Sequence, residues 1–193
     1  MATDTRTLNQ SRNLMGDQSE VWLFGYGSLI HKVDFDYLER RPASIEGWAR
    51  RFWQGSHDHR GTSDNPGRVV TLVEVPGVQC EGMAYRVTPD VFDHLDHREK
   101  NGYLRESVIM AFADGTTARG VTYRAGEDNA AFLGPAPEAD IAAQIARCHG
   151  PSGSNRDYLL QLAQALRALD ERDDHVFAIE RHLRAQDTHT RQS

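Results

Sequence analysis

The chain has 193 residues and a mass of 21.7 kDa, which at ~150 residues per domain corresponds to one domain. Its 22 basic and 28 acidic side chains give a formal net charge of -6, which argues against a protein that binds nucleic acid or an anionic membrane through a basic surface. The mean hydropathy is -0.61, and the sequence has neither an apolar run near the ~18 residues of a membrane span nor a start that resembles a secretory signal. We therefore expect a soluble, cytoplasmic protein.

The two cysteines, Cys80 and Cys148, lie far apart in the sequence and form no C-x-x-C pair. This pattern indicates neither a disulfide framework nor a zinc ribbon. We expect both thiols to be reduced and buried.

A polar leader opens the chain, and a succession of short strands follows it. Residues 1–20 are rich in Thr, Asn, Gln and Ser with almost no apolar period, as in a mobile segment. Val21 begins an aromatic and β-branched run that stops at a glycine turn, which is typical of a strand followed by a tight turn. About six strands are expected in all, and the further five are predicted at residues 45–53, 68–75, 81–87, 104–112 and 118–124. Asp114-Gly115 predicts a hairpin turn between the last two.

Helices interrupt the strands once and then follow them. Pro89 marks the start of a helix that reaches about residue 100, and three more helices are expected after Pro137, the second capped by Ser154 or Asn155. Strands first and helices afterwards predict an α+β domain with an antiparallel or mixed sheet, open or closed into a barrel, and helices on its outside. The predicted division is a leader at residues 1–20, a single domain at 21–185 and a polar tail at 186–193.

The sequence Gly25-Tyr26-Gly27-Ser28 places two glycines at positions i and i+2. Such a pattern lets the backbone take positive φ and brings successive N–H groups near a ligand, a nest that binds carboxylates or oxyanions. An ordinary glycine turn has the same spacing. Ser28 is a weak candidate nucleophile, because the second glycine of G-x-S-x-G is missing.

Glu99 lies close to the end of the helix predicted before residue 100, where Asn101-Gly102 supplies residues that tolerate a left-handed C-cap. A carboxylate at that position feels the negative end of the helix, which raises its pKa toward the range of a general base. A solvated glutamate beside Arg98 and Lys100 is the alternative interpretation.

Two histidine pairs, His57 with His59 and His94 with His97, have spacings at which two imidazoles can reach one metal ion. A third ligand is not evident, and no H-E-x-x-H or cysteine pattern accompanies them. Chance pairs are also expected among nine histidines.

Residues 47–70 carry four arginines and two aspartates, a local charge of four minus two, or +2, in an acidic chain. These arginines either pair with acidic neighbours on a solvated face or, beside aromatic side chains, recognise a small carboxylate ligand. They are Arg50, Arg51, Arg60 and Arg68.

Together, these residues resemble the ChaC-type glutathione-specific γ-glutamylcyclotransferases. The resemblance covers about residues 21–183, and its many separate motifs occur in the same order. The motifs include Phe24-Gly25-Tyr26-Gly27-Ser28-Leu29-Ile30, Arg51-Phe52-Trp53-Gln54-Gly55-Ser56, Asp58-His59-Arg60-Gly61, Arg98-Glu99-Lys100, Gly102-Tyr103 and Gly150-Pro151-Ser152-Gly153-Ser154-Asn155 with Tyr158-Leu159. Two departures from the family pattern are His31, where tryptophan is common, and Asn101, where glycine is common and a left-handed conformation would suit asparagine.

The resemblance implies a mixed β-barrel with flanking helices and a reaction without cofactor or metal. In that reaction the free amine of glutathione attacks its own γ-amide carbonyl, which releases cysteinylglycine and closes 5-oxoproline. The resemblance assigns the general acid/base to Glu99. It assigns substrate binding to the loop of Leu23, Phe24, Gly25, Tyr26, Gly27 and Ser28, and it offers Arg60 and Tyr158 as further substrate contacts.

Two other functions stay open at this point. The first is a binding or regulatory protein that holds a γ-glutamyl compound on the same fold without turning it over. The second is a metal-dependent amide hydrolase that uses His57, His59 and His94 and releases free glutamate. The products formed from glutathione distinguish all three.

Overall fold

The computed structural model describes residues 4–12 and 14–190, which form two compact units. The first unit takes its residues from Met1–Ala49 and Leu72–Ala130, and the second takes its residues from Arg50–Thr71 and Ala131–Ser193. We call them the barrel unit and the helical unit, and we describe each by itself. Long strands run from one unit into the other, so the division does not coincide with the ends of elements.

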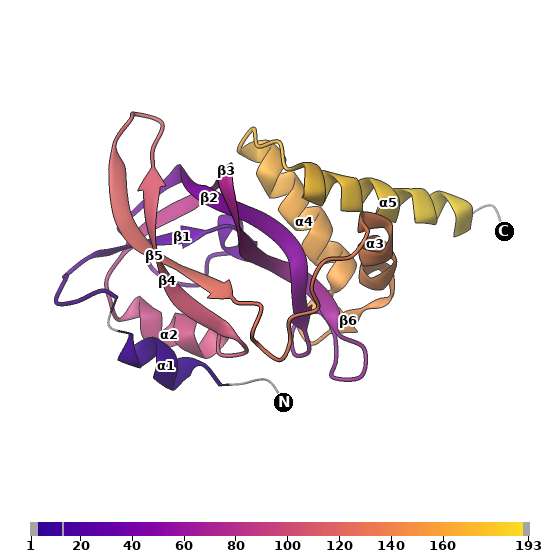
Figure 1. Cartoon of the computed structure of the whole chain (residues 1–193), viewed down its shortest axis with the longest axis horizontal. Coiled ribbons are helices and arrows are strands. Elements are labelled where there is room, and N and C mark those ends of the chain that lie inside the picture. The colour runs from indigo at the N-terminus through magenta and orange to yellow at the C-terminus, as the bar shows by residue number, and fades with distance from the viewer. Residues whose placement is uncertain (1–3, 13, 191–193) are drawn as a thin grey trace. The chain divides into compact units, whose positions relative to one another are not determined.

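Five strands close into a barrel in the order β1-β3-β2-β4-β5 (Figure 1). β1 is antiparallel to β3 and parallel to β5, so the sheet is mixed, as the α+β prediction allowed. The β4–β5 hairpin turns at the predicted Asp114-Gly115, where Gly115 has φ 83°. The strands are β1 (Val21–Gly25), β2 (Glu39–Ser56), β3 (Gly67–Val87), β4 (Tyr103–Ala111) and β5 (Thr117–Ala125).

The prediction of about six strands was wrong by one in the barrel. Residues 68–75 and 81–87, predicted as two strands, form the single strand β3. Pro76 and Gly77 resemble a turn, and Gly77 does take a positive φ of 79°. The strand continues through them because residues 76–79 are exposed and an irregular backbone there costs no core packing. A small sheet of β6 (His149–Gly150) and β7 (Gly153–Ser154) was not predicted.

The core of the barrel unit is made of the apolar side chains that the strand pattern assigned to it. Leu23, Phe24 and Tyr85 are at most 1% exposed, and Met110 is fully buried. Burying one such side chain contributes about 1.5–3 kcal/mol. The short strand β1 is paired on both edges, with β3 and with β5, and this fixes the start of the glycine loop.

Helices occur near all the predicted positions. α2 (Val91–Arg98) begins two residues after Pro89 and belongs to the barrel unit. The helical unit contains α3 (Glu138–Arg147), α4 (Asn155–Ala168) and α5 (Asp174–Thr190) (Figure 1). Ser154 caps α4 as predicted, and its Oγ accepts the Asp157 N–H at 3.0 Å. No helix within the described residues is long and apolar enough to cross a membrane.

The polar ends of the chain carry more regular structure than their composition indicated. The leader contains the short helix α1 (Arg6–Ser11), which lies beside α2 (Figure 1). Thr5 and Asn9 in this segment are 4% and 0% exposed. At the other end, α5 continues through Thr190 into the predicted tail, whose residues 191–193 lie outside the described part. Residues 1–3 and 13 of the leader also lie outside it.

Candidate active site

The glycine loop leaves the end of β1 and turns at once into a short 3-10 helix, η1 (Ser28–Ile30). Gly27 precedes this helix, and its carbonyl accepts the Ile30 N–H at 3.0 Å. The side chains of Leu23 and Phe24 belong to the core, and both residues pair with β3 and β5. Both side chains are therefore buried, and the predicted part of these two residues in substrate binding stays a prediction.

The expected reason for the glycines is wrong in one respect. Neither Gly25 nor Gly27 has a positive φ, and Gly27 lies at φ -125° and ψ -127°. What requires glycine at position 25 is close packing, because a Cβ there would lie 2.6 Å from the Cβ of Leu29. Glycine thus lets η1 fold back onto the end of β1.

Hydrogen bonds from the barrel hold the loop on several sides. The Tyr26 hydroxyl donates to the Tyr123 carbonyl at 2.6 Å, and the Tyr85 hydroxyl donates to the Leu29 carbonyl at 2.5 Å. Thr122 Oγ1 donates to the Phe24 carbonyl at 2.9 Å, which removes that oxygen from contact with a ligand. These hydrogen bonds from the barrel therefore hold the backbone of the loop in one conformation.

Glu99 is the C-cap of α2, as the sequence predicted, and its N–H donates to the Leu95 carbonyl at 2.8 Å. Its side chain is 19% exposed, so solvent reaches only part of it. Of the two residues expected in a left-handed conformation, only Gly102 adopts it, at φ 98°. Asn101 instead forms an isolated antiparallel bridge with Asp4, so the expected left-handed asparagine is wrong.

Arg98 joins Glu99 to the glycine loop. Its Nε lies 3.5 Å from Glu99 Oε1, and its Nη2 donates to Ser28 Oγ at 2.9 Å. Its Nη1 donates to Asp34 Oδ1 at 2.9 Å. The guanidinium is 18% exposed. Glu99 therefore lies beside Arg98 and is only partly open to solvent, and its role as a general acid/base stays a prediction.

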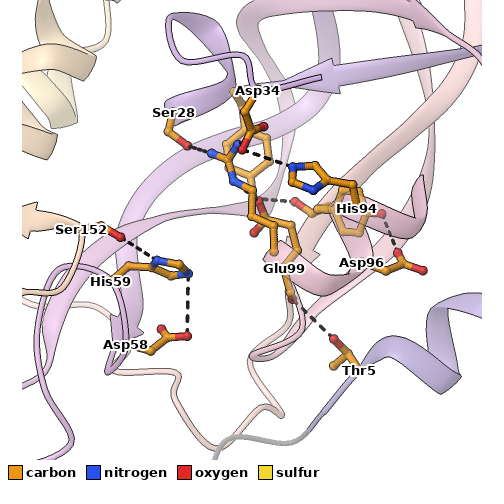
Figure 2. A network of polar contacts seen from close by, with 12 residues as sticks. Thr5, Ser28, Asp34, Asp58, His59, His94, Asp96, Glu99 and Ser152 are labelled. Atoms are coloured by element: carbon orange, nitrogen blue, oxygen red, sulfur yellow. Dashed lines mark hydrogen bonds and ion pairs between the residues drawn. The ribbon is translucent and has the colours of Figure 1, made fainter. Parts of the chain in front are cut away.

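Asp34 completes this charged cluster. Its Oδ2 lies 3.2 Å from His94 Nε2, while its other oxygen accepts from Arg98 (Figure 2). Burial alone would raise the pKa of the Asp34 carboxyl, but the positive charges of Arg98 and His94 lower it. His94 and Arg98 are four residues apart, so one face of α2 presents both to Asp34.

A second, fully buried ion pair holds α2 to the barrel from inside. Asp96 accepts two hydrogen bonds from Arg105, at 2.9 and 2.6 Å, and one from the Tyr123 hydroxyl at 2.6 Å. The side chains of Asp96 and Arg105 are 2% and 4% exposed. Burial and the neighbouring Asp96 carboxylate raise the pKa of Tyr123, so this hydroxyl stays a donor. The network fixes the helix that carries Glu99.

Arg60 and Tyr158 belong to the helical unit. The Arg60 guanidinium lies 5.5 Å from the centre of the Tyr158 ring and donates to the Ser154 carbonyl at 3.1 Å. The Tyr158 hydroxyl accepts the Val70 N–H at 3.4 Å. Both side chains are nearly buried, at 8% exposure, and support one another. Their predicted contacts to substrate remain predictions.

Two of the other arginines at residues 47–70 are structural. Arg50 is buried and pairs with Asp173 at 2.6 Å. Arg68 donates to the carbonyls of Phe52 and Gly134, both at 2.9 Å, and burial lowers its pKa. Neither matches a solvated face, and neither guanidinium is directed to a ligand by these contacts.

The histidines do not assemble into a ligand set. Within the described residues, no three side chains of His, Cys, Asp and Glu come together as metal ligands would. His94 pairs with Asp34, and His59 Nδ1 lies 2.9 Å from Ser152 Oγ in the helical unit (Figure 2). Cys80 and Cys148 are both buried, as expected.

The cluster that Asp34, His94 and Arg98 form beside Glu99 was not predicted from the sequence. Arg98 was named there only as a neighbour of Glu99, on a solvated surface or within the Arg98-Glu99-Lys100 motif. The spacing of His94 and Arg98 on one helical face is a signal of a shared partner, but nothing in the sequence identifies that partner as Asp34.

The chain is similar to proteins of one known family over most of its length. The model of the ChaC-like protein family matches residues 21–186. Glutathione-specific gamma-glutamylcyclotransferase 1 of Danio rerio is 42% identical over 185 residues, which cover 90% of this chain and 94% of that protein. Gamma-glutamylcyclotransferase 2-3 of Arabidopsis thaliana is 46% identical over 169 residues, which cover 81% and 84% of the two chains.

A solved structure shares the fold as well. The crystal structure of the selenomethionine-labelled yeast γ-glutamylcyclotransferase specific to glutathione superposes with a TM-score of 0.80 at 33% identity, and the match covers 87% of this chain and 97% of that one. Family model, sequence relatives and structural neighbour therefore agree over nearly the same residues. The chain belongs to the ChaC-like protein family.

Proposed function

We propose that this protein is a glutathione-specific γ-glutamylcyclotransferase, which converts glutathione into 5-oxoproline and cysteinylglycine. The observation that carries the proposal is the link from Ser28 through Arg98 to Glu99, which ties a carboxylate to a rigid glycine loop within one unit. The names of the relatives support the choice of substrate. The two free, buried thiols fit a reducing compartment, the cytoplasm, as the place of the reaction.

The reaction is intramolecular, so the main task of the site is orientation. The γ-glutamyl amine must reach its own γ-carbonyl carbon, and holding the bent conformer supplies up to about 7–11 kcal/mol of the required barrier reduction. In this proposal the backbone amides of the loop from Gly25 to Ser28 hold the α-carboxylate or the developing oxyanion. Anchoring by Tyr26 and Tyr85 keeps the loop in place while the substrate bends.

Glu99 moves the proton. The amine of glutathione is an ammonium at neutral pH, and Glu99 accepts one of its protons so that the nitrogen can attack. A new C–N bond closes the five-membered ring, and the bond to the cysteinyl nitrogen breaks. Glu99 returns its proton to that nitrogen, and the ring nitrogen then loses its second proton to the carboxylate so regenerated. That proton ends on the departing amine, which leaves as an ammonium, so the atoms balance without water. Arg98 holds the carboxylate beside the loop between turnovers.

Glu99→Gln tests this proposal, because it keeps the shape and removes the base. We expect the folded variant to lose about 100- to 10,000-fold in kcat with glutathione, measured as 5-oxoproline and cysteinylglycine by mass spectrometry. Wild-type turnover in Glu99→Gln would refute the assigned role.

The same products decide between the alternatives. Free glutamate would indicate a hydrolase, and a stable glutathione complex without 5-oxoproline would indicate a binding protein. Oxidised glutathione and γ-glutamyl-alanine serve as comparison substrates for specificity.

A further inference from the structure

The N-terminal segment grips the backbone on which Glu99 stands. The Thr5 N–H donates to the Lys100 carbonyl at 2.9 Å. The Thr5 hydroxyl lies 3.0 Å from the same carbonyl oxygen and 3.5 Å from the carbonyl oxygen of Glu99 (Figure 2). Asp4 pairs with Asn101 in an isolated bridge. These contacts satisfy carbonyls that the end of a helix leaves without partners inside the helix.

Asn9 continues the grip along the start of β4. Its side-chain oxygen accepts the Arg105 N–H at 2.8 Å, and its side-chain nitrogen donates to the Tyr103 carbonyl at 3.1 Å. This is the pattern that one residue of a parallel neighbouring strand would make. The side chain of Asn9 is fully buried, and its amide takes the place of a strand partner along this stretch of β4.

We propose that residues 4–12, which we call the N-terminal clasp, position Glu99 for catalysis through the backbone of residues 99–105. The clasp lies before residue 21, outside the part of the chain that the ChaC-like family model matches. Thr5 and Asn9 are its positioning residues. Their side chains bond to the backbone of residues 99–105 and act on the Glu99 carboxyl group through that backbone. This inference rests on the proposed function, because it concerns the acid/base role of Glu99.

The clasp acts on one half of the site only. The glycine loop is held by hydrogen bonds from Tyr26, Tyr85 and Thr122. The side-chain hydrogen bonds of Thr5 and Asn9 lead instead to the backbone of residues 99–105. Loosening the clasp therefore leaves substrate binding by the loop in place and displaces the carboxylate. An effect on kcat with little effect on KM follows, because proton transfer needs the carboxylate at a defined distance.

The test compares point variants of the full chain at a temperature well below each variant's Tm. We expect Thr5→Val and Asn9→Leu each to lower kcat for glutathione about tenfold while KM changes by less than about twofold. Thr5→Ser, which keeps the hydroxyl, retains the wild-type kcat. Ser11→Ala is the matched control, because its exposed hydroxyl donates only to the Leu8 carbonyl within α1.

Amide hydrogen exchange at Arg105 reports on the clasp independently of turnover, since its N–H is bonded to Asn9. Faster exchange in Asn9→Leu together with lower kcat supports the proposal. Unchanged exchange, wild-type kcat despite faster exchange, or a rise in KM alone would overturn it. A wild-type protein that forms no 5-oxoproline would instead refute the proposed function itself.

Discussion

Arg98 and Glu99 are neighbours in the chain, and their side chains also meet, with Arg98 Nε 3.5 Å from Glu99 Oε1. The same guanidinium donates to Ser28 at the end of the glycine loop and to Asp34. In the proposed mechanism, one side chain therefore connects the loop that binds the substrate with the carboxylate that transfers protons. Its planar fork has a nitrogen for each of the three partners, which a lysine would not have.

Replacing this fork should affect catalysis more than binding. We expect Arg98→Ala to lower kcat up to about 100-fold, because Glu99 and the loop lose their common tether. Steady-state kinetics with glutathione measures kcat and KM and so separates the two effects.

His94→Gln is the control for Arg98→Ala. It removes the other partner of Asp34 on the same face of α2 and leaves the bonds of Arg98 to Ser28 and Glu99 intact. If the two variants lose activity equally, Arg98 acts only through Asp34 and the tether is not the cause.

Gly25→Ala should damage the loop by steric contact. The added Cβ would lie 2.6 Å from the Cβ of Leu29, so η1 must move away from β1. We expect KM for glutathione to rise about tenfold or more, because the loop amides no longer converge on the substrate.

Gly115→Ala in the β4–β5 turn is the control. Its added Cβ meets nothing within 4 Å, although its positive φ makes alanine unfavourable there. That variant should lose stability while KM stays at the wild-type value.

Sequence reasoning succeeded where the signal was local. Ser154 caps α4 and Asp114-Gly115 closes a hairpin because each residue's own side chain or backbone satisfies the turn it starts. Glu99 at the end of α2 follows from the same kind of short-range pattern. Motif order over the whole chain then identified the family, which no single motif did.

Prediction from the sequence failed where residues far apart in the chain determine the packing or the burial of a side chain. Gly25 is glycine because Leu29 packs against it, and only the folded loop brings them together. Thr5 and Asn9 are polar residues in a polar leader, so composition assigns them to solvent. Both residues are buried because they find hydrogen-bond partners inside the fold. The Thr5 hydroxyl donates to the Lys100 carbonyl, and Asn9 accepts the Arg105 N–H of β4. Composition counts polar groups and does not reveal their partners.

The buried pair of Asp96 and Arg105 should dominate the stability of the barrel unit's polar interior. We expect Asp96→Asn to lower the free energy of unfolding by about 3–5 kcal/mol, because it leaves a guanidinium buried without its counter-charge. Tyr123→Phe removes one hydrogen bond from the same carboxylate and should cost about 1–3 kcal/mol. Urea unfolding at pH 7 measures both. A smaller loss for Asp96→Asn than for Tyr123→Phe would contradict the importance of the charge.

His175 should make the stability of the protein depend on pH. Its Nε2 accepts the Phe52 N–H at 3.0 Å, which requires the neutral ring. Burial, together with the charge of Arg51, lowers the pKa of His175, although Asp173 and Glu138 oppose this shift. The unfolded chain therefore binds the proton more tightly than the folded one. The free energy of unfolding should be highest above pH 6.5 and fall as the pH decreases from 6.5 toward the lower pKa of the folded state.

Urea unfolding at about pH 7.5 and 5.5 tests this pH dependence. His175→Gln, whose side-chain carbonyl can accept the same N–H, should show a smaller difference between the two pH values. Equal differences in the two proteins would assign the pH dependence to other groups.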